Sequence, residues 1–83
     1  MPVDILYFAW VRERIGLSGE TVVTAAKDVA ALVAELRARG ERHADVFADT
    51  RALRVALDRE LGDFSSRLAG VREVAFFPPM TGG

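Results

Sequence analysis

Two long apolar segments near the two ends of the chain constrain its fold most strongly. Both Val3–Val11 and Val71–Phe77 are rich in β-branched and aromatic residues. Segments this apolar are typical of central strands that are covered on both faces. We therefore expect the two strands to lie side by side and parallel in the middle of a sheet. Pro78 and Pro79 end the second strand, because proline cannot donate to a strand ladder.

One amphipathic helix is predicted between these strands, over Asp28–Arg39. Asp28 is a suitable N-cap, and Gly40 is expected at the C′ position that follows the last helical turn. Apolar residues at positions i, i+3, i+4 and i+7 predict the helix face that packs on the sheet. That stripe consists of Val29, Leu32, Val33 and Leu36.

Shorter segments supply the remaining elements. Residues 12–16 are compatible with one helical turn that stops at the glycine. Glu20–Thr24 is a β-branched strand, and its closeness in sequence to the first strand predicts an antiparallel, hairpin-like pairing. Leu53–Leu57 alternates apolar and polar residues, as a half-buried strand does. Residues 61–64 predict a brief edge strand.

The segment 41–50 is ambiguous, although Val46 and Phe47 could anchor a short second helix. The element order predicts an α+β fold with one main helix packed across a mixed sheet of four or five strands. The length of 83 residues suits a single domain. We assign this domain to residues 1–77 and interpret residues 78–83 as a flexible C-terminal tail.

Composition excludes several classes of function. With 11 basic and 12 acidic residues the net charge is −1. The protein therefore has no positive electrostatic field that would attract nucleic acid or an anionic membrane. No apolar run approaches the roughly 20 residues that span a bilayer. The N-terminus lacks the basic start of a signal peptide, which predicts a cytoplasmic protein. The chain has no cysteine and one histidine, which excludes thiolate or multi-histidine metal sites and a cysteine nucleophile.

The last six residues, PPMTGG, are an unusual ending for a packed domain. Pro78 and Pro79 are stiff and fix the direction in which the chain leaves the sheet. Fully extended, residues 78–83 reach roughly 20 Å. Gly82 and Gly83 can pass through a channel that is closed to bulkier residues, and the α-carboxylate of Gly83 becomes reactive once a nucleotide activates it. The tail is therefore interpreted either as a segment that enters another protein's active site or as a frayed end.

Two stretches of the chain resemble a known family. VAFFPPMTGG, Val74–Gly83, is similar to the C-terminal signature of the small subunit of molybdopterin synthase. LYFAWVRERIG, Leu6–Gly16, is similar to the N-terminal stretch of the same family, so the resemblance covers the whole chain. The family consists of ubiquitin-like sulfur carriers with a β-grasp fold, which agrees with the element order above.

The resemblance implies a chemistry for the tail. In that family an activating enzyme uses ATP to adenylate the C-terminal carboxylate, here that of Gly83, and sulfur delivery then gives a thiocarboxylate. The tail enters the large subunit of the synthase, where the sulfur passes to cyclic pyranopterin monophosphate. Two carriers and two large subunits form a heterotetramer, and the catalytic side chains belong to the large subunit. The carrier itself is expected to bind no cofactor or metal.

The resemblance also implies a partner surface. Phe8, Leu61 and Phe77 are expected to form an apolar patch that docks on the large subunit and on the activating enzyme. Arg12 is expected at the same interface, and the alternatives are a core role for the apolar residues and an ordinary surface charge for Arg12. Phe76 and Phe77 face opposite sides of their strand, so one of them belongs to the core. Further partner contacts are expected from Pro78 and Pro79, and Met80, Thr81 and Gly82 are expected to form the tail that carries Gly83.

Other polar or aromatic residues have an ordinary interpretation beside a functional one. Trp10 departs from the family pattern and either enlarges the patch or caps the core. His43 is interpreted as a surface or hydrogen-bonded histidine. Asp58, Glu60 and Asp63 follow a strand, where acids suit a turn better than a metal site.

Two other functions are compatible with the sequence. A sibling carrier for thiamine or another sulfur-transfer pathway would use the same tail chemistry with a different acceptor. A ubiquitin-like modifier would instead form an amide with a lysine of its target, and a plain binding module would keep its function without the last two residues.

Overall fold

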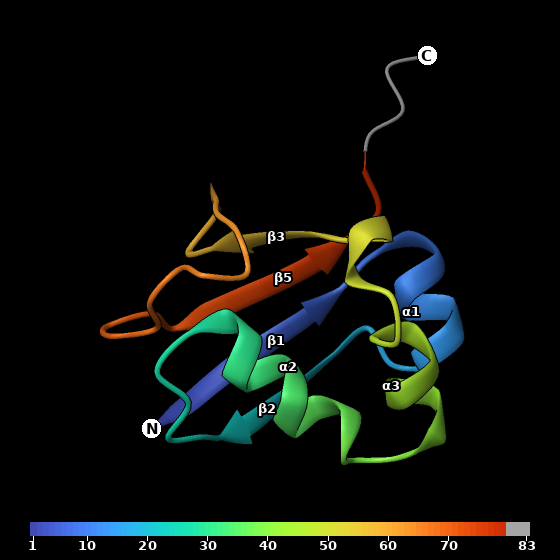
Figure 1. The fold of residues 1–83 in the computed structure, drawn as a ribbon, viewed down its shortest axis with the longest axis horizontal. Helices are drawn as coiled ribbons and strands as arrows, with labels where there is room; N and C mark the ends of the chain where they lie inside the picture. Colours follow the sequence, from blue (N-terminus) through green and yellow to red (C-terminus); the bar gives the residue numbers. More distant parts are fainter. Residues whose placement is uncertain (80–83) are drawn as a thin grey trace.

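The fold is organised around a mixed five-stranded sheet with the strand order β2-β1-β5-β3-β4, in a computed structural model that describes residues 1–79. The strands are β1 (Pro2–Tyr7), β2 (Gly19–Val23), β3 (Arg54–Leu57), β4 (Glu60–Leu61) and β5 (Glu73–Phe77). Strands β1 and β5 pair in parallel at the centre, and β2 and β3 flank them in antiparallel pairing (Figure 1). The predicted central, parallel placement of the first and last strands is confirmed.

Three α-helices and one 3₁₀ helix accompany the sheet in the described part of the chain. They are α1 (Ala9–Ile15), α2 (Val29–Arg37), α3 (Glu41–Val46) and η1 (Thr50–Ala52). The longest, α2, lies across one face of the sheet, as the predicted α+β arrangement requires (Figure 1). None of the helices within residues 1–79 is long and apolar enough to cross a bilayer.

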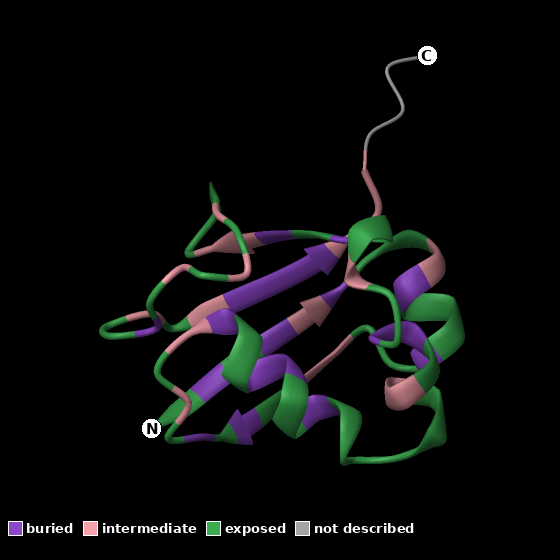
Figure 2. Ribbon diagram, viewed as in Figure 1, coloured by how far each residue is buried: buried purple, intermediate pink, exposed green. Residues whose placement is uncertain are grey.

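The core lies between the helices and one face of the sheet. Figure 2 shows buried residues along the central strands and on the inner side of α2. The predicted stripe of α2 is confirmed, because all four of its members are buried: Val29, Leu32, Val33 and Leu36. Phe47 follows α3 and packs edge-on against the buried Phe76, with 4.9 Å between ring centroids. The short second helix is thus anchored by Val46 and Phe47, as its sequence indicated.

The predicted end of the main helix was wrong. Asp28 caps the N-terminus as expected, since its side chain accepts a hydrogen bond from the Ala31 amide at 2.8 Å. The helix ends at Arg37 with Ala38 as its C-cap, two residues before the glycine. Gly40 is in an extended conformation and is instead the N-cap residue of α3.

The predicted strand Val3–Val11 was also wrong in its second half. Strand β1 ends at Tyr7, and the chain enters α1, in which Val11 and Ile15 are both buried one helical turn apart. Helix α1 ends at Gly16, whose φ of 88° is in the left-handed region that glycine favours. The pairing of β1 with β2 is antiparallel as predicted, but this helix connects the strands in place of a hairpin turn.

The second half of the sheet is shorter than predicted. Strand β3 begins at Arg54, and β4 covers only Glu60–Leu61 in place of residues 61–64. A Cβ atom on Gly62 would overlap Leu57 Cδ1 and lie 2.9 Å from Ser66 Oγ, so only glycine fits the close packing directly after β4. The last strand begins at Glu73, two residues later than the apolar pattern indicated.

The junction between β1 and α1 carries backbone strain that a substitution can relieve. Ala9 has a φ of 52°, in the left-handed region that costs a non-glycine residue about 1 kcal/mol. Its side chain is exposed, so Ala9→Gly should lose little packing and raise the free energy of unfolding by up to about 1 kcal/mol in urea denaturation. The matched control is Ala34→Gly within α2, which should lower it by about 1 kcal/mol. Equal losses in both variants would contradict a strained Ala9.

Candidate docking surface and tail exit

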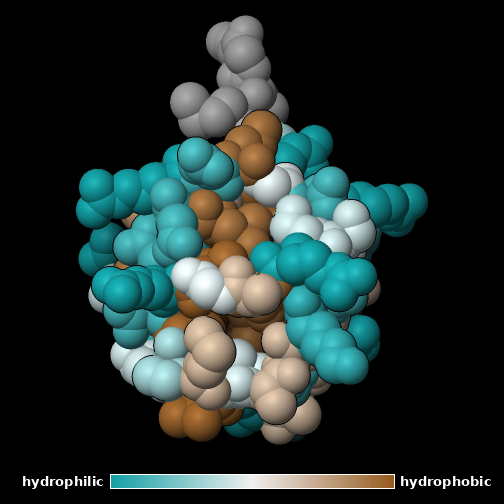
Figure 3. Space-filling model, turned by 90° about the vertical axis from the view of Figure 1, so that its left-hand side faces the viewer, coloured by the Kyte–Doolittle hydropathy of each residue, from teal (hydrophilic) through white to brown (hydrophobic). Residues whose placement is uncertain are grey.

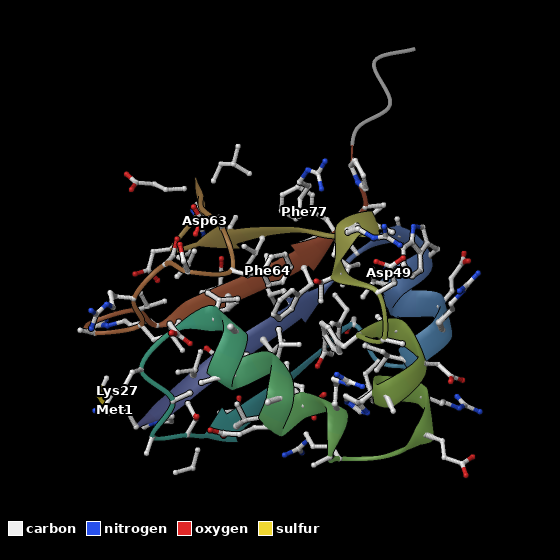
Figure 4. All side chains as sticks on the ribbon, viewed as in Figure 1. Met1, Lys27, Asp49, Asp63, Phe64 and Phe77 are labelled. Atoms are coloured by element: carbon white, nitrogen blue, oxygen red, sulfur yellow. The ribbon has the colours of Figure 1, made fainter. Side chains whose placement is uncertain are left out.

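The sheet has a second face that the helices leave open, and the strand registers show which side chains lie on it. Along β5, Val74 and Phe76 are buried in the core, so Ala75 and Phe77 point to the opposite face. Phe77 lies opposite Arg54 of β3. Figure 4 shows the Phe77 side chain beside β3, away from α2. The prediction that Phe76 and Phe77 divide between core and surface is confirmed.

Cross-strand neighbours extend Phe77 into an apolar patch. The Phe8 amide donates a hydrogen bond to the Phe76 carbonyl at 3.1 Å, which continues the β1–β5 pairing and sets Phe8 beside Phe77. Ala56 pairs with Ala75 on one side and with Leu61 on the other. We call this set the open-face patch: Leu6, Phe8, Ala56, Leu61, Ala75 and Phe77.

Two members of the open-face patch are exposed, which is unusual for large apolar side chains. Phe8 is 48% exposed and Leu61 is 74% exposed, whereas Phe77 is half-buried. Apolar side chains gathered on one sheet face of a small protein mark an interaction surface. The structure thus brings Phe8, Leu61 and Phe77 to one face. Polar residues occupy the other end of that face, where Asp4 pairs with Glu73 across the parallel strands.

The tail leaves the domain at the same end as the patch. Strand β5 ends at Phe77, and the chain continues into the half-buried Pro78 and Pro79, which lead away from the sheet (Figure 1). The predicted tail residues Met80, Thr81, Gly82 and Gly83 lie outside the described residues. A partner bound to the patch would therefore also be next to the start of the tail.

The sequence profile of the ThiS family matches residues 5–83, nearly the whole chain. The chain belongs to the ThiS family. Its members are ubiquitin-like sulfur carriers, so the resemblance read from VAFFPPMTGG is confirmed at the level of the family.

Two curated relatives share this ThiS-family sequence over almost their full length. The molybdopterin synthase sulfur carrier subunit of Escherichia coli (strain K12) is 37% identical over 98% of this chain and 99% of its own. The protein of the same name from Haemophilus influenzae is 31% identical over the same shares of the two chains.

Solved structures place the ThiS-family fold among known β-grasp proteins. SAMP1 from Haloferax volcanii superimposes with a TM-score of 0.74 at 20% identity, over 100% of both chains. A putative molybdopterin converting factor, subunit 1, from Pyrococcus furiosus gives 0.72 at 20% identity, over 96% of this chain and 99% of that one. At this identity the likeness shows the fold alone, and it confirms the predicted β-grasp class.

Arg12 and Trp10 of this ThiS-family chain lie on α1, which follows Phe8 directly. Arg12 is exposed in the last turns of the helix, where a positive charge favours the C-terminal end of the helix dipole. Trp10 is half-buried against the core, and the Arg14 guanidinium lies 4.9 Å above its ring. The packing of Trp10 against the core favours the core-capping interpretation. The role of Arg12 at a partner interface stays a prediction.

A partly buried polar cluster lies on the helix side of the sheet, away from the patch. Glu20 Oε2 accepts a hydrogen bond from the Tyr7 hydroxyl at 2.7 Å and lies 2.7 Å from His43 Nε2. Glu20 Oε1 forms an ion pair with Arg39 at 3.0 Å. Because an ionised carboxylate can only accept, His43 Nε2 carries the proton in this pair. His43 is thus a hydrogen-bonded histidine that ties α3 to β2, in agreement with its ordinary interpretation.

The cluster shifts two pKa values in opposite directions. Burial, together with the hydrogen bond to Glu20, raises the pKa of the Tyr7 hydroxyl far above its usual range. Burial alone would raise the pKa of Glu20, but the hydrogen bonds from His43 and Tyr7 and the charge of Arg39 outweigh it and lower that pKa. Glu20 therefore stabilises the fold in its ionised form.

This assignment predicts a pH-dependent effect of Glu20→Gln. A carboxyl group whose pKa is lowered by folding contributes stability above its unfolded pKa of about 4.3 and loses it as the pH falls further. At pH 7 the variant should be less stable than the parent by about 1.5–3 kcal/mol, the value of a hydrogen bond to a charged group. Urea denaturation between pH 5 and pH 3 should show this difference shrinking. A constant difference would mean that the charge of Glu20 contributes nothing.

The acidic side chains of Asp58 and Asp63, which follow β3, accept hydrogen bonds from the backbone at turns. The Asp58 carboxylate accepts hydrogen bonds from the Arg72 and Glu73 amides, both at 3.0 Å. Asp63 accepts from the Ser65 amide and hydroxyl, and these hydrogen bonds lower its pKa. Within residues 1–79 no three histidine, cysteine or acidic side chains gather as a metal site would require.

The end of the molecule opposite the tail has a separate hollow. It has a volume of about 460 Å³ and lies beside Met1, Lys27 and Leu68. Figure 3 faces this end and shows hydrophobic atoms on the floor of a hollow that is bordered by hydrophilic side chains. No residue of the predicted site lines it, but Lys27 provides a charge that is remote from the patch.

Sequence reasoning missed half of the open-face patch. Leu6, Ala56 and Ala75 were not among the expected partner residues, although alternation along each strand places them on the same face as Phe77. Arg54 was also missed, because an arginine in an alternating strand is typical of any solvated face. Its position opposite Phe77 is visible only once the register is known.

Proposed function

We propose that this chain is the sulfur carrier subunit of a molybdopterin synthase and that Gly83 carries the sulfur. The observation that supports this best is 37% identity to a molybdopterin synthase sulfur carrier subunit over 98% of the chain, together with the intact FFPPMTGG ending. An ATP-dependent enzyme adenylates the Gly83 carboxylate, and a sulfur donor displaces AMP to give the thiocarboxylate. The thiocarboxylate donates its sulfur to cyclic pyranopterin monophosphate.

The residue types of the chain are compatible with this chemistry. A carboxylate is a poor acyl donor, and its attack on ATP, with release of pyrophosphate, gives an acyl adenylate in which AMP is the leaving group. The chain has no cysteine, so it cannot hold sulfur as a persulfide on its own side chains. The two terminal glycines leave the reactive end narrow enough for a closed channel. The chain itself supplies the acyl group, and ATP is bound by the activating enzyme.

The large subunit of the synthase is the proposed partner, in a complex of two carriers and two large subunits in the cytosol. The open-face patch supports this, since Phe8 is exposed beside Phe77 at the end from which the tail leaves. Docking there would direct the tail toward the partner. Arg12 lies on α1, the helix that directly follows Phe8 of the patch. The activating enzyme must handle the same tail, so the two partners are expected to bind in turn.

Mass spectrometry of the protein produced together with its activating enzyme and sulfur donor tests the proposal. We expect exchange of one oxygen for sulfur at Gly83, located by fragmentation of the C-terminal peptide. The control is the same protein produced without the activating enzyme, which should keep its oxygen. If the exchange never occurs at Gly83, the carrier function is wrong. Complementation of a strain that lacks the small subunit then identifies the acceptor as the molybdenum pathway rather than thiamine synthesis.

A further inference from the structure

A pocket of about 500 Å³ opens beside the first half of β3. Strand β4 pairs only with Ala56 and Leu57, so it does not extend beside Leu53 and Arg54. The Gly62 amide donates to the Val55 carbonyl at 2.9 Å, and the chain then turns away through Asp63. The space left between this turn and η1 is the pocket.

The interior of the pocket is apolar. Leu53 and Val55, each only 1% exposed, contribute to its lining. The half-buried Phe64 lines it as well. Figure 4 shows Phe64 on the helix side of the sheet and Phe77 on the other side. Leu61 belongs both to the lining of the pocket and to the open-face patch, so the two surfaces are continuous.

Two arginines line the pocket. One of them forms an ion pair with a carboxylate of this chain, and the other does not. Arg51 is paired with Asp49, with contacts of 3.0 and 3.1 Å between the guanidinium and the two carboxylate oxygens. The Arg54 guanidinium donates to the Leu53 carbonyl at 2.9 Å and to the Arg51 carbonyl at 3.3 Å. Within residues 1–79 no carboxylate forms an ion pair with Arg54, and the nearby Asp63 accepts hydrogen bonds from its own turn.

Arg54 therefore provides a positive charge between the pocket and the patch. Its carbonyl contacts orient the guanidinium without neutralising it, and its strand position sets it opposite Phe77. A carboxylate brought to this point by a partner would complete the hydrogen bonding of the guanidinium and balance its charge.

We propose that this pocket receives an apolar side chain of the docked large subunit, next to a carboxylate of the same subunit that pairs with Arg54. This inference rests on the proposed function and adds a specificity element to it. The apolar lining provides the burial, and Arg54 provides the charge selection that distinguishes an acidic partner segment from a neutral or basic one. The apolar residues of the patch alone would not make that distinction.

Binding of the purified large subunit to charge-reversal variants, measured by isothermal titration calorimetry, tests the role of Arg54. Arg54→Glu should weaken binding about tenfold or more, because it places like charges together. Lys27→Glu changes the net charge by the same amount and should weaken binding less than about threefold, since Lys27 is remote from both the pocket and the patch. The deficit of Arg54→Glu should shrink in high salt. Equal effects of the two reversals would reduce Arg54 to a contribution to overall charge and overturn the proposal.

A second variant tests the pocket itself. Thr50→Phe adds a ring at the lining of the pocket and should weaken binding about tenfold, with a thermal melt to show that the fold is kept. Phe77→Ala is measured in parallel. If Phe77→Ala weakens binding but neither Thr50→Phe nor Arg54→Glu does, the pocket has no role while docking on the open face stands. If none of the three has an effect, the proposed docking of the large subunit fails as well.

Discussion

Deletion of Gly83 is expected to abolish sulfur transfer and to leave the stability of the fold unchanged. The deletion moves the C-terminal carboxylate to Gly82 and shortens the tail by about 3.5 Å. Misplacement of a reacting group by about 1 Å already costs on the order of 100-fold in rate, so the loss should exceed this. The measurement is formation of molybdopterin by the reconstituted synthase with carrier that has been through the activating reaction.

The stability of the same variant provides its internal control. The described core ends with Phe76, so loss of Gly83 should change the free energy of unfolding by less than about 0.5 kcal/mol. A matched variant with one residue added after Gly83 keeps every native residue and should be equally inactive. Transfer by either variant would show that another group carries the sulfur. A large loss of stability would show that the tail is part of the packed fold.

Replacement of the two neighbouring phenylalanines should separate folding from docking. Phe76 is fully buried, with its ring centroid 4.9 Å from that of Phe47 and 6.4 Å from that of Tyr7. Phe76→Ala should therefore cost about 3–5 kcal/mol, a large part of the stability of a small domain. Phe77→Ala should cost less than about 1.5 kcal/mol and instead weaken binding of the large subunit about 30-fold, as expected for an aromatic residue at the centre of an interface.

The comparison uses two measurements on each variant, thermal unfolding and titration with the large subunit. Any weaker binding by Phe76→Ala should be accounted for by its unfolded fraction, whereas Phe77→Ala should bind weakly while fully folded. A collapse of the melting temperature in Phe77→Ala would reverse the assignment of the two faces. Normal binding by a folded Phe77→Ala would remove the open-face patch as the docking surface.

The sequence predicted the centre of the fold better than its connections. Strand β5 is hydrogen-bonded on both sides and buries Val74 and Phe76 in the core, which gives it a recognisable apolar pattern, and α2 has a helical stripe long enough to recognise. The stretch after Tyr7 was misread because Phe8, Trp10 and Val11 favour strands by type. What ends the strand is the left-handed conformation of Ala9, which no residue pattern announces in an alanine.

The candidate site was predictable where it depends on residue type and not where it depends on register. Resemblance to the family supplied Phe8, Leu61 and Phe77, and the structure brings them together on one face. Arg54 and the pocket beside β3 depend on the short length of β4 and on the close packing at Gly62. Such features arise from the packing of segments that are distant in the sequence, so local sequence patterns do not predict them.

The position of β5 has a mechanical consequence for the proposed function, in which the tail enters and leaves a partner. Strand β5 is hydrogen-bonded on both sides, to β1 and to β3, and the tail continues directly from its end. A pull on the tail therefore acts along β5 and loads both ladders in shear, so many hydrogen bonds must break together rather than one after another. Withdrawal from a narrow channel would then leave the domain folded, and the same molecule could be loaded again.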